Sequence, residues 1–145
     1  MSFSNDPAPE TTNPSEFGPA TDALTGRRIL IVEDDPFIAL ALEDTLREHG
    51  LVVVAVARRL KQALDLLGKE TIDLALLDVN IGEETIDPVA DLLAARNCPF
   101  VFTTGYGRAG LPENHASRMI VEKPFYIEEI LTALRNELIA ALRVT

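Results

Sequence analysis

Short apolar runs alternate with amphipathic segments between residues 28 and 143, and this alternation limits the fold more than any other feature of the sequence. Apolar runs without polar alternation are typical of strands that are buried on both faces. The sequence predicts five such strands, at residues 28–33, 51–57, 72–77, 99–103 and 118–122. The spacing of apolar residues predicts helices over residues 36–49, 59–68, 86–96 and 126–143.

Strands and helices in this order form a parallel sheet with right-handed crossovers and helices on both faces. We therefore predict an α/β fold, a doubly wound (βα)5 five-stranded parallel sheet of flavodoxin-like order 2-1-3-4-5. The pattern is weakest between Gly105 and Ser117, where three glycines and a proline interrupt it. A fourth helix in this segment would be short or mobile.

Composition changes near residue 26. Residues 1–26 contain four of the nine prolines and no Lys or Arg, so we predict a flexible acidic tail there and one folded domain over 27–145.

The net charge of −10 argues against nucleic acid and against anionic membrane surfaces as partners. No apolar run approaches the ~20 residues that cross a bilayer, and no secretion signal is present, so we expect a cytoplasmic protein.

Three acidic residues directly follow the first predicted strand, in the stretch "ILIVEDDPF". Glu33 and Asp34 fall at the carboxyl end of strand one, and Asp78 falls at the same end of strand three, in "LALLDVN". In an open parallel sheet these ends meet where ligands bind. Carboxylates that converge there repel one another, and a divalent cation removes that penalty. Because oxygen ligands of this kind suit Mg²⁺, the sequence predicts a magnesium site at this edge.

Two further polar residues end strands at the same edge. Thr104 follows the fourth strand, and Lys123 follows the fifth. A hydroxyl and an ammonium that face a carboxylate and Mg²⁺ would bind a phosphoryl group, with Asp78 as the nucleophile that forms an aspartyl phosphate. Each residue taken alone has an ordinary explanation, since Asp34 or Asp35 could simply cap the first helix. The combination is what argues for a site.

These motifs resemble those of response-regulator receiver domains of bacterial two-component signalling. The matching stretches are "VEDD", "LLDVN", "TTG" and "EKPF", and the resemblance covers residues 27–143. It implies that Asp78 accepts a phosphoryl group from a phosphohistidine of a histidine kinase or phosphotransfer protein. It also implies that Asp34 and Asp78 bind Mg²⁺ directly, with the backbone carbonyl of Asn80, and that Glu33 acts through water.

The resemblance further assigns Thr104 and Lys123 to the phosphoryl oxygens, and it implies a cis peptide before Pro124. Catalysis would be limited to the protein's own phosphorylation and dephosphorylation, so we do not expect an enzyme. We expect no effector domain after this one. We therefore expect a single-domain regulator that signals by phosphorylation-dependent binding to a downstream protein, or that drains phosphate from a kinase.

One position departs from the common receiver pattern. Ile120 stands on the fifth strand where receivers commonly carry an aromatic switch residue. Tyr106 instead lies two residues after Thr104, in "PFVFTTGYG", which resembles the "PFxFATGxx" motif of FAT GUY receivers. Members of that subgroup often work with kinases of the HWE or HisKA2 type. We therefore predict that Tyr106 is a switch residue and that residues 105–117 become more ordered on phosphorylation.

Three other classes of function fit parts of the pattern. An Mg²⁺-dependent phosphatase with an Asp nucleophile usually carries a D-x-D motif after its first strand, and "EDDPF" lacks it. A degenerate receiver that only binds proteins would not need the complete set of site residues. A nucleotide-binding flavodoxin-like domain would need a Gly-rich loop after the first strand. Among the remaining residues, we expect His49 and His115 to be exposed and Cys98 to be a small buried apolar residue.

Overall fold

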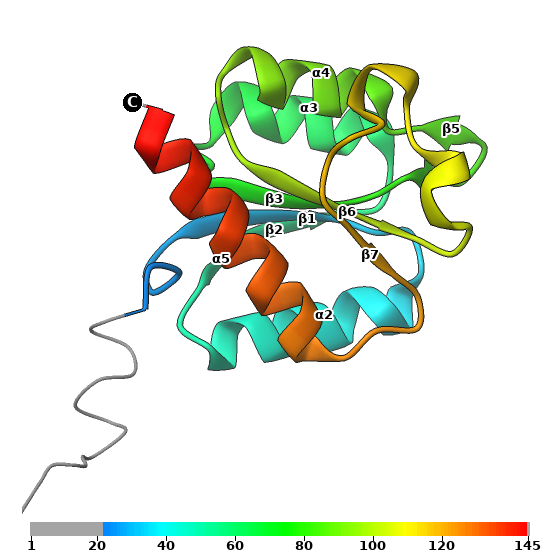
Figure 1. Cartoon of the computed structure of the whole chain (residues 1–145). Helices are drawn as coiled ribbons and strands as arrows, with labels where there is room; N and C mark the ends of the chain where they lie inside the picture. Colours follow the sequence, from blue (N-terminus) through cyan, green and yellow to red (C-terminus); the bar gives the residue numbers. More distant parts are fainter. Residues whose placement is uncertain (1–21, 145) are drawn as a thin grey trace, which may run out of the picture.

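The structure, a computed structural model, describes residues 22–144 and has a five-stranded parallel sheet at its centre (Figure 1). The strand order is β2-β1-β3-β6-β7. This order and the parallel pairing confirm the flavodoxin-like fold predicted from the sequence. The five strands are β1 (Arg28–Val32), β2 (Val52–Ala57), β3 (Leu74–Asp78), β6 (Phe100–Thr104) and β7 (Ile120–Glu122).

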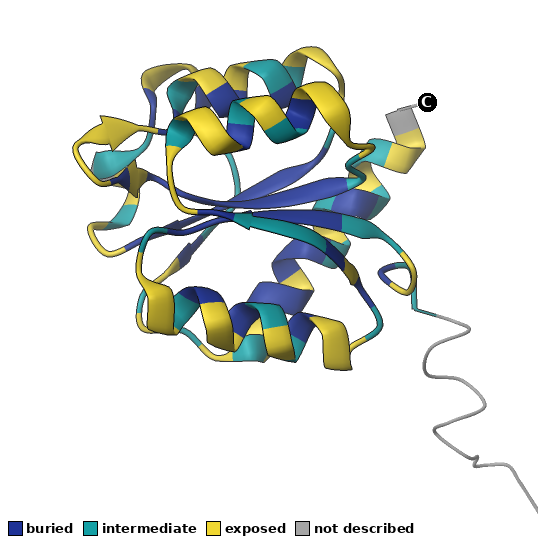
Figure 2. Ribbon diagram, turned by 180° about the vertical axis from the view of Figure 1, so that it is seen from behind, coloured by how far each residue is buried: buried dark blue, intermediate teal, exposed yellow. Residues whose placement is uncertain are grey.

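Helices cover both faces of this sheet (Figures 1 and 2). On one face lie α2 (Pro36–Glu48) and α5 (Ile127–Val144), and on the other lie α3 (Leu60–Lys69) and α4 (Asp87–Ala95). Every predicted strand and helix is present, with ends shifted by no more than two residues. No described helix combines the length and the apolar character that a membrane span requires.

The central strands are mainly apolar because both of their faces are covered. Along β1, β3 and β6, alternate side chains point to opposite sides of the sheet. One set packs with α2 and α5, and it includes Ile29, Ile31, Leu74, Leu76 and Val101. The other set packs with α3 and α4, and it includes Leu30, Val32, Ala75, Leu77, Phe100 and Phe102. A core on each face holds the carboxyl ends of these strands in fixed positions.

The folded domain begins before the predicted boundary at residue 26. Leu24 is fully buried in the core, and the Gly26 N–H donates to the Gly50 carbonyl at 2.8 Å. Asp22 pairs with Arg135 of α5 at 3.0 Å, and this hydrogen-bonded partner holds the pKa of the Asp22 carboxyl below its usual range. The assignment of residues 22–26 to the tail was therefore wrong, because the short apolar pair Ala23–Leu24 carries no periodic signal. Residues 1–21 of the predicted tail lie outside the described residues.

A short antiparallel hairpin, which the sequence analysis did not predict, follows β3. It consists of β4 (Asn80–Ile81) and β5 (Glu84–Thr85). Gly82 stands at its turn with a φ of 61°, a conformation that favours glycine. The hairpin is too short to produce a periodic pattern in the sequence.

The segment between β6 and β7 contains no α-helix within the described residues. It has two short 3₁₀ helices, η1 (Gly107–Gly110) and η2 (Glu113–His115), as the interrupted pattern led us to expect. The prediction that His115 is exposed was wrong. Its ring is buried, with its centroid 5.6 Å from the Phe100 ring centroid, and its Nε2 lies 2.8 Å from Asp91 Oδ1 of α4. Because the described residues between β6 and β7 form no α-helix, His115 covers the aromatic side chains of β6.

Of the other two residues in this group, His49 is exposed as expected, and Cys98 is less buried than expected. His49 is exposed at the end of α2. Cys98 is half-buried, and burial raises the pKa of its thiol to about 11. A thiol with this pKa is uncharged at neutral pH, which agrees with a small apolar packing residue.

Candidate functional site

The carboxyl ends of four strands meet at one edge of the sheet, and the predicted site residues extend from this edge. Glu33 and Asp34 directly follow β1, and Asp78 is the last residue of β3. Thr104 is the last residue of β6, and Lys123 follows β7. The three acids each place a carboxylate oxygen within 4.8 Å of the others. The structure thus brings the three predicted metal ligands together.

Lys123 is the positive partner of the two buried acids. Its Nζ lies 3.0 Å from Asp78 Oδ2 and 3.1 Å from Glu33 Oε1. The peptide that joins Lys123 to Pro124 is cis, as the resemblance implied. One ammonium cannot balance three carboxylates, so the cluster retains negative charge that a divalent cation would neutralise.

Burial dominates the electrostatics of Glu33. Its side chain is 1% exposed, and burial together with the nearby charge of Asp78 raises its pKa from 4.5 to about 7, although the Asp35 N–H acts in the opposite direction. Burial also acts to lower the pKa of Lys123, but hydrogen bonds to Asp78 and Glu33 raise it overall. Within the described residues, Glu33 Oε1 is buried and accepts no hydrogen bond, although Lys123 lies nearby. This oxygen keeps the Lys123 ammonium at 3.1 Å as its ion-pair partner, and the all-oxygen donor set of the three acids fits Mg²⁺.

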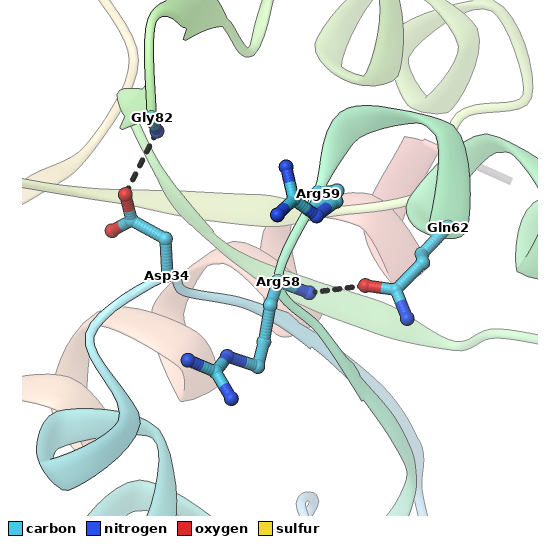
Figure 3. A pocket seen from close by; sticks show the side chains of 5 residues that line it. All are labelled: Asp34, Arg58, Arg59, Gln62 and Gly82. Atoms are coloured by element: carbon cyan, nitrogen blue, oxygen red, sulfur yellow. Dashed lines mark hydrogen bonds between the residues drawn. The ribbon is translucent and has the colours of Figure 1, made fainter.

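The three consecutive acids have different local roles. Asp35 caps α2, since its Oδ1 accepts the N–H groups of Phe37 at 2.9 Å and of Ile38 at 3.2 Å. Asp34 does not cap the helix. Its Oδ2 accepts the N–H of Gly82 at 2.8 Å (Figure 3). The turn of the β4–β5 hairpin therefore helps to hold a predicted metal ligand in place.

Asn80 and Thr104 lie at the same edge but form different contacts. The Asn80 N–H donates to Asp78 Oδ1 at 3.2 Å, while the ligand role of its carbonyl stays a prediction. The Thr104 side chain is buried, and its Oγ1 accepts the N–H of Tyr106 at 3.0 Å and lies 3.5 Å from the Gly107 carbonyl oxygen. Within residues 22–144 this hydroxyl forms no hydrogen bond with the acidic cluster. Tyr106 is 76% exposed, so its ring is free to contact a partner.

A second group of polar side chains, which the sequence analysis did not select, lies beside Asp34. Arg58 and Arg59 follow β2, and together with Gln62, Gly82 and Asp34 they line a cavity of about 440 Å³ (Figure 3). A signal was present, because β2 ends at the same edge of the sheet as β1. Exposed arginines after a strand are common, so the residue type alone is a weak signal.

Comparisons with known proteins agree with this geometry. The family model described as "Response regulator receiver domain" matches residues 29–135. The solution structure of SdrG from Sphingomonas melonis Fr1 is 39% identical, with a TM-score of 0.68, and the match covers 81% of this chain and 97% of SdrG.

Two curated relatives are longer proteins. The phyllosphere-induced regulator PhyR of Methylorubrum extorquens is 32% identical over 114 residues, which are 76% of this chain and 43% of PhyR. The transcriptional regulatory protein PdtaR of Mycobacterium tuberculosis is 31% identical over 123 residues, which are 81% of this chain and 60% of PdtaR. The chain thus spans about half the length of these two regulators.

Proposed function

This chain belongs to the response regulator receiver family, and from this premise we propose that Asp78 accepts a phosphoryl group from a phosphohistidine of a histidine kinase or phosphotransfer protein. One observation carries the proposal. The Asp78 carboxylate lies at the edge of the sheet, 3.0 Å from Lys123 Nζ and beside Glu33 and Asp34. A nucleophilic carboxylate needs a positive group at this distance to hold the incoming phosphoryl oxygens.

Each site residue has a defined task in the transfer. A carboxylate oxygen of Asp78 attacks the phosphorus, the P–N bond of the donor breaks, and the imidazole leaves with the electron pair and takes up a proton. Lys123 orients the carboxylate before the reaction and contacts a phosphoryl oxygen after it. The Thr104 hydroxyl donates to a second phosphoryl oxygen, for which it gives up its contact with the Gly107 carbonyl.

Glu33, Asp34 and Asp78 are the residues that would hold Mg²⁺, with the backbone carbonyl of Asn80 as a further ligand. When bound, Mg²⁺ supplies positive charge that neutralises the acids and the phosphoryl oxygens. The proposal draws support from the convergence of the three carboxylates within 4.8 Å and from the buried Glu33 oxygen without a hydrogen bond.

The output of the phosphorylated form is proposed to be protein binding, with the drain of phosphate from a kinase as the second candidate. The exposed Tyr106 supports the first, because its N–H is bonded to the Thr104 hydroxyl and links the site to the surface. The "FTTGYG" stretch, through its resemblance to the FAT GUY receivers, supports a kinase of the HWE or HisKA2 type as the donor.

The test is intact mass spectrometry after treatment with acetyl phosphate and Mg²⁺. We expect a gain of one phosphoryl group, and no gain when the metal is chelated. A degenerate receiver would gain no mass in either condition. A phosphatase would release inorganic phosphate over many turnovers, which a phosphate assay on the same samples detects. The absence of a mass gain, together with unchanged amide spectra in beryllofluoride, would overturn the proposal.

A further inference from the structure

Arg58 and Arg59 carry charges that no described residue balances. Within residues 22–144 neither guanidinium forms an ion pair or a side-chain hydrogen bond, whereas Arg28 and Arg135 each pair with a carboxylate. The Arg58 backbone N–H donates to Gln62 Oε1 at 2.9 Å, which leaves the Gln62 amide group as a further donor at the cavity. Positive charge and hydrogen-bond donors are therefore available in a chain of net charge −10.

The position of these arginines connects them with the acidic site. Val32 of β1 pairs with Ala57 of β2, and the Glu33 N–H donates to the Ala57 carbonyl at 3.0 Å. Arg58, the first residue after β2, therefore lies at the same edge of the sheet as Glu33. The cavity of about 440 Å³ has Asp34 and Gly82 on one side and the arginines on the other (Figure 3). Its volume lies in the range of small ligand sites.

We infer that this cavity binds a carboxylate carried by the phosphodonor, next to the phosphoryl group that Asp78 receives. The inference rests on the proposed function. A guanidinium presents a planar pair of donors that matches a carboxylate or a phosphate. The donor's phosphoryl group is held by Lys123 and Thr104, so the remaining anionic groups of a protein donor are the side chains of Asp and Glu.

Charge explains why such a contact is needed. The chain repels an acidic donor at long range, and two positive groups beside the acceptor provide local attraction and fix the donor's orientation. Asp34 on the facing side accepts the Gly82 N–H and is a proposed metal ligand, so its charge is compensated by those contacts.

Two small donors with the same reacting bond test the inference. One is N-phosphorylated imidazole, and the other is N-phosphorylated 3-(imidazol-4-yl)propanoate, which adds a carboxylate on a chain of side-chain length. In both, the P–N bond breaks, a P–O bond to Asp78 forms, and the imidazole takes up a proton. Rates in Mg²⁺ are followed by intact mass. We expect the wild type to prefer the propanoate donor by roughly tenfold, the size of one charge-assisted contact.

The double variant Arg58→Gln/Arg59→Gln should lose this preference and still react with phosphorylated imidazole. The control variant Lys69→Gln/Arg143→Gln removes the same charge at exposed positions that do not line the cavity and should keep the preference. Equal donor ratios in the wild type and the Arg58/Arg59 variant would overturn the inference while the proposed function stands. Failure of the wild type to react with either donor would instead contradict the proposed function.

A metal-free measurement gives a second readout. The protein is titrated with unphosphorylated 3-(imidazol-4-yl)propanoate and, in a separate experiment, with 4-propylimidazole, which lacks the carboxylate. The Arg Nε–H signals of the protein are followed by NMR in both titrations. Shifts of the Arg58 and Arg59 signals with the carboxylate alone are expected. Equal shifts with both compounds would contradict carboxylate binding.

Discussion

The acidic site and the segment from Gly105 to Met119 are held in place in different ways. At the site, Asp34 is held by the Gly82 N–H, and Asp78 is held by the Asn80 N–H and by Lys123. The Gly105–Met119 segment contains two short 3₁₀ helices and is held by the Tyr106 N–H to Thr104, by His115 to Asp91, and internally by Arg108, which donates to the Ala116 and Arg118 carbonyls. The comparison teaches that bonds between strand ends preorganise the reacting groups, whereas the described residues between them and the surface form only 3₁₀ helices and turns.

The largest effect should come from Asp78→Asn, which removes the proposed nucleophile of the acidic site. We expect complete loss of phosphoryl labelling by acetyl phosphate in Mg²⁺, measured by intact mass. Tyr106→Ala, in the Gly105–Met119 segment, should keep full labelling. Persistent labelling of the Asp78 variant would show that another residue accepts the phosphoryl group.

The second prediction concerns how the stability of the metal-free protein depends on pH, because Glu33 is buried beside another carboxylate. Glu33 keeps its proton in the folded state up to about pH 7, whereas in the unfolded chain it ionises near 4.5, so unfolding releases a proton in this window. Metal-free stability should therefore fall as pH rises from about 5 to 8, by about 3 kcal/mol at about 1.4 kcal/mol per pKa unit. Urea unfolding in EDTA across this range measures the change.

Glu33→Gln removes the titration, so its stability curve should be flatter and higher at pH 8. Glu83→Gln, an exposed acid in the neighbouring hairpin, is the matched control and should follow the wild type. Parallel curves for the wild type and the Glu33 variant would count against a raised pKa.

The third prediction tests the contacts by which His115 holds the Gly105–Met119 segment on β6 and α4. His115→Ala should destabilise the domain by about 2 kcal/mol, because it removes a buried ring that contacts Phe100 and Phe102 and a hydrogen bond to Asp91. Labelling of Asp78 should persist. Urea unfolding measures the cost, and His49→Ala, at an exposed histidine, serves as the control with a change within about 0.5 kcal/mol. A similar cost for both variants would remove the special role of His115.

The fourth prediction is that millimolar Mg²⁺ stabilises the folded protein by about 1 kcal/mol at neutral pH, because it binds only the folded state. Thermal melts should shift upward in the wild type and much less in Asp34→Ala. His115→Ala, which alters the segment and leaves the acids in place, should keep the full Mg²⁺ response. An unchanged midpoint in the wild type would speak against a metal site.

The sheet and the convergence of Glu33, Asp34 and Asp78 at one edge could be predicted from the sequence for a common physical reason. The buried strands β1, β3 and β6 are mainly apolar, and the residue type changes to polar or acidic where each strand reaches the open edge. Glu33, Asp34 and Asp78 could therefore be selected as neighbours from strand ends alone.

The missed features depend on contacts that leave no periodic signal. Leu24 is a single buried residue in a polar stretch, and the Gly82 turn that holds Asp34 belongs to a hairpin of two-residue strands. The burial of His115 depends on its contacts with the buried rings of Phe100 and Phe102 and with the Asp91 carboxylate, which come together only in the assembled domain.

The smallest expected effect concerns Tyr106. Thr104 Oγ1 accepts the Tyr106 N–H at 3.0 Å, and its proton is directed toward the Gly107 carbonyl at 3.5 Å. When this proton is donated to a phosphoryl oxygen on Asp78, the hydroxyl turns away from Gly107 and the bonded backbone of Tyr106 follows. Beryllofluoride should therefore shift the amide NMR signals between Gly105 and Ser117, and Thr104→Ala should reduce these shifts. Unchanged signals over this segment would refute the switch, as would a Tyr106→Ala variant that still binds its partner only when phosphorylated.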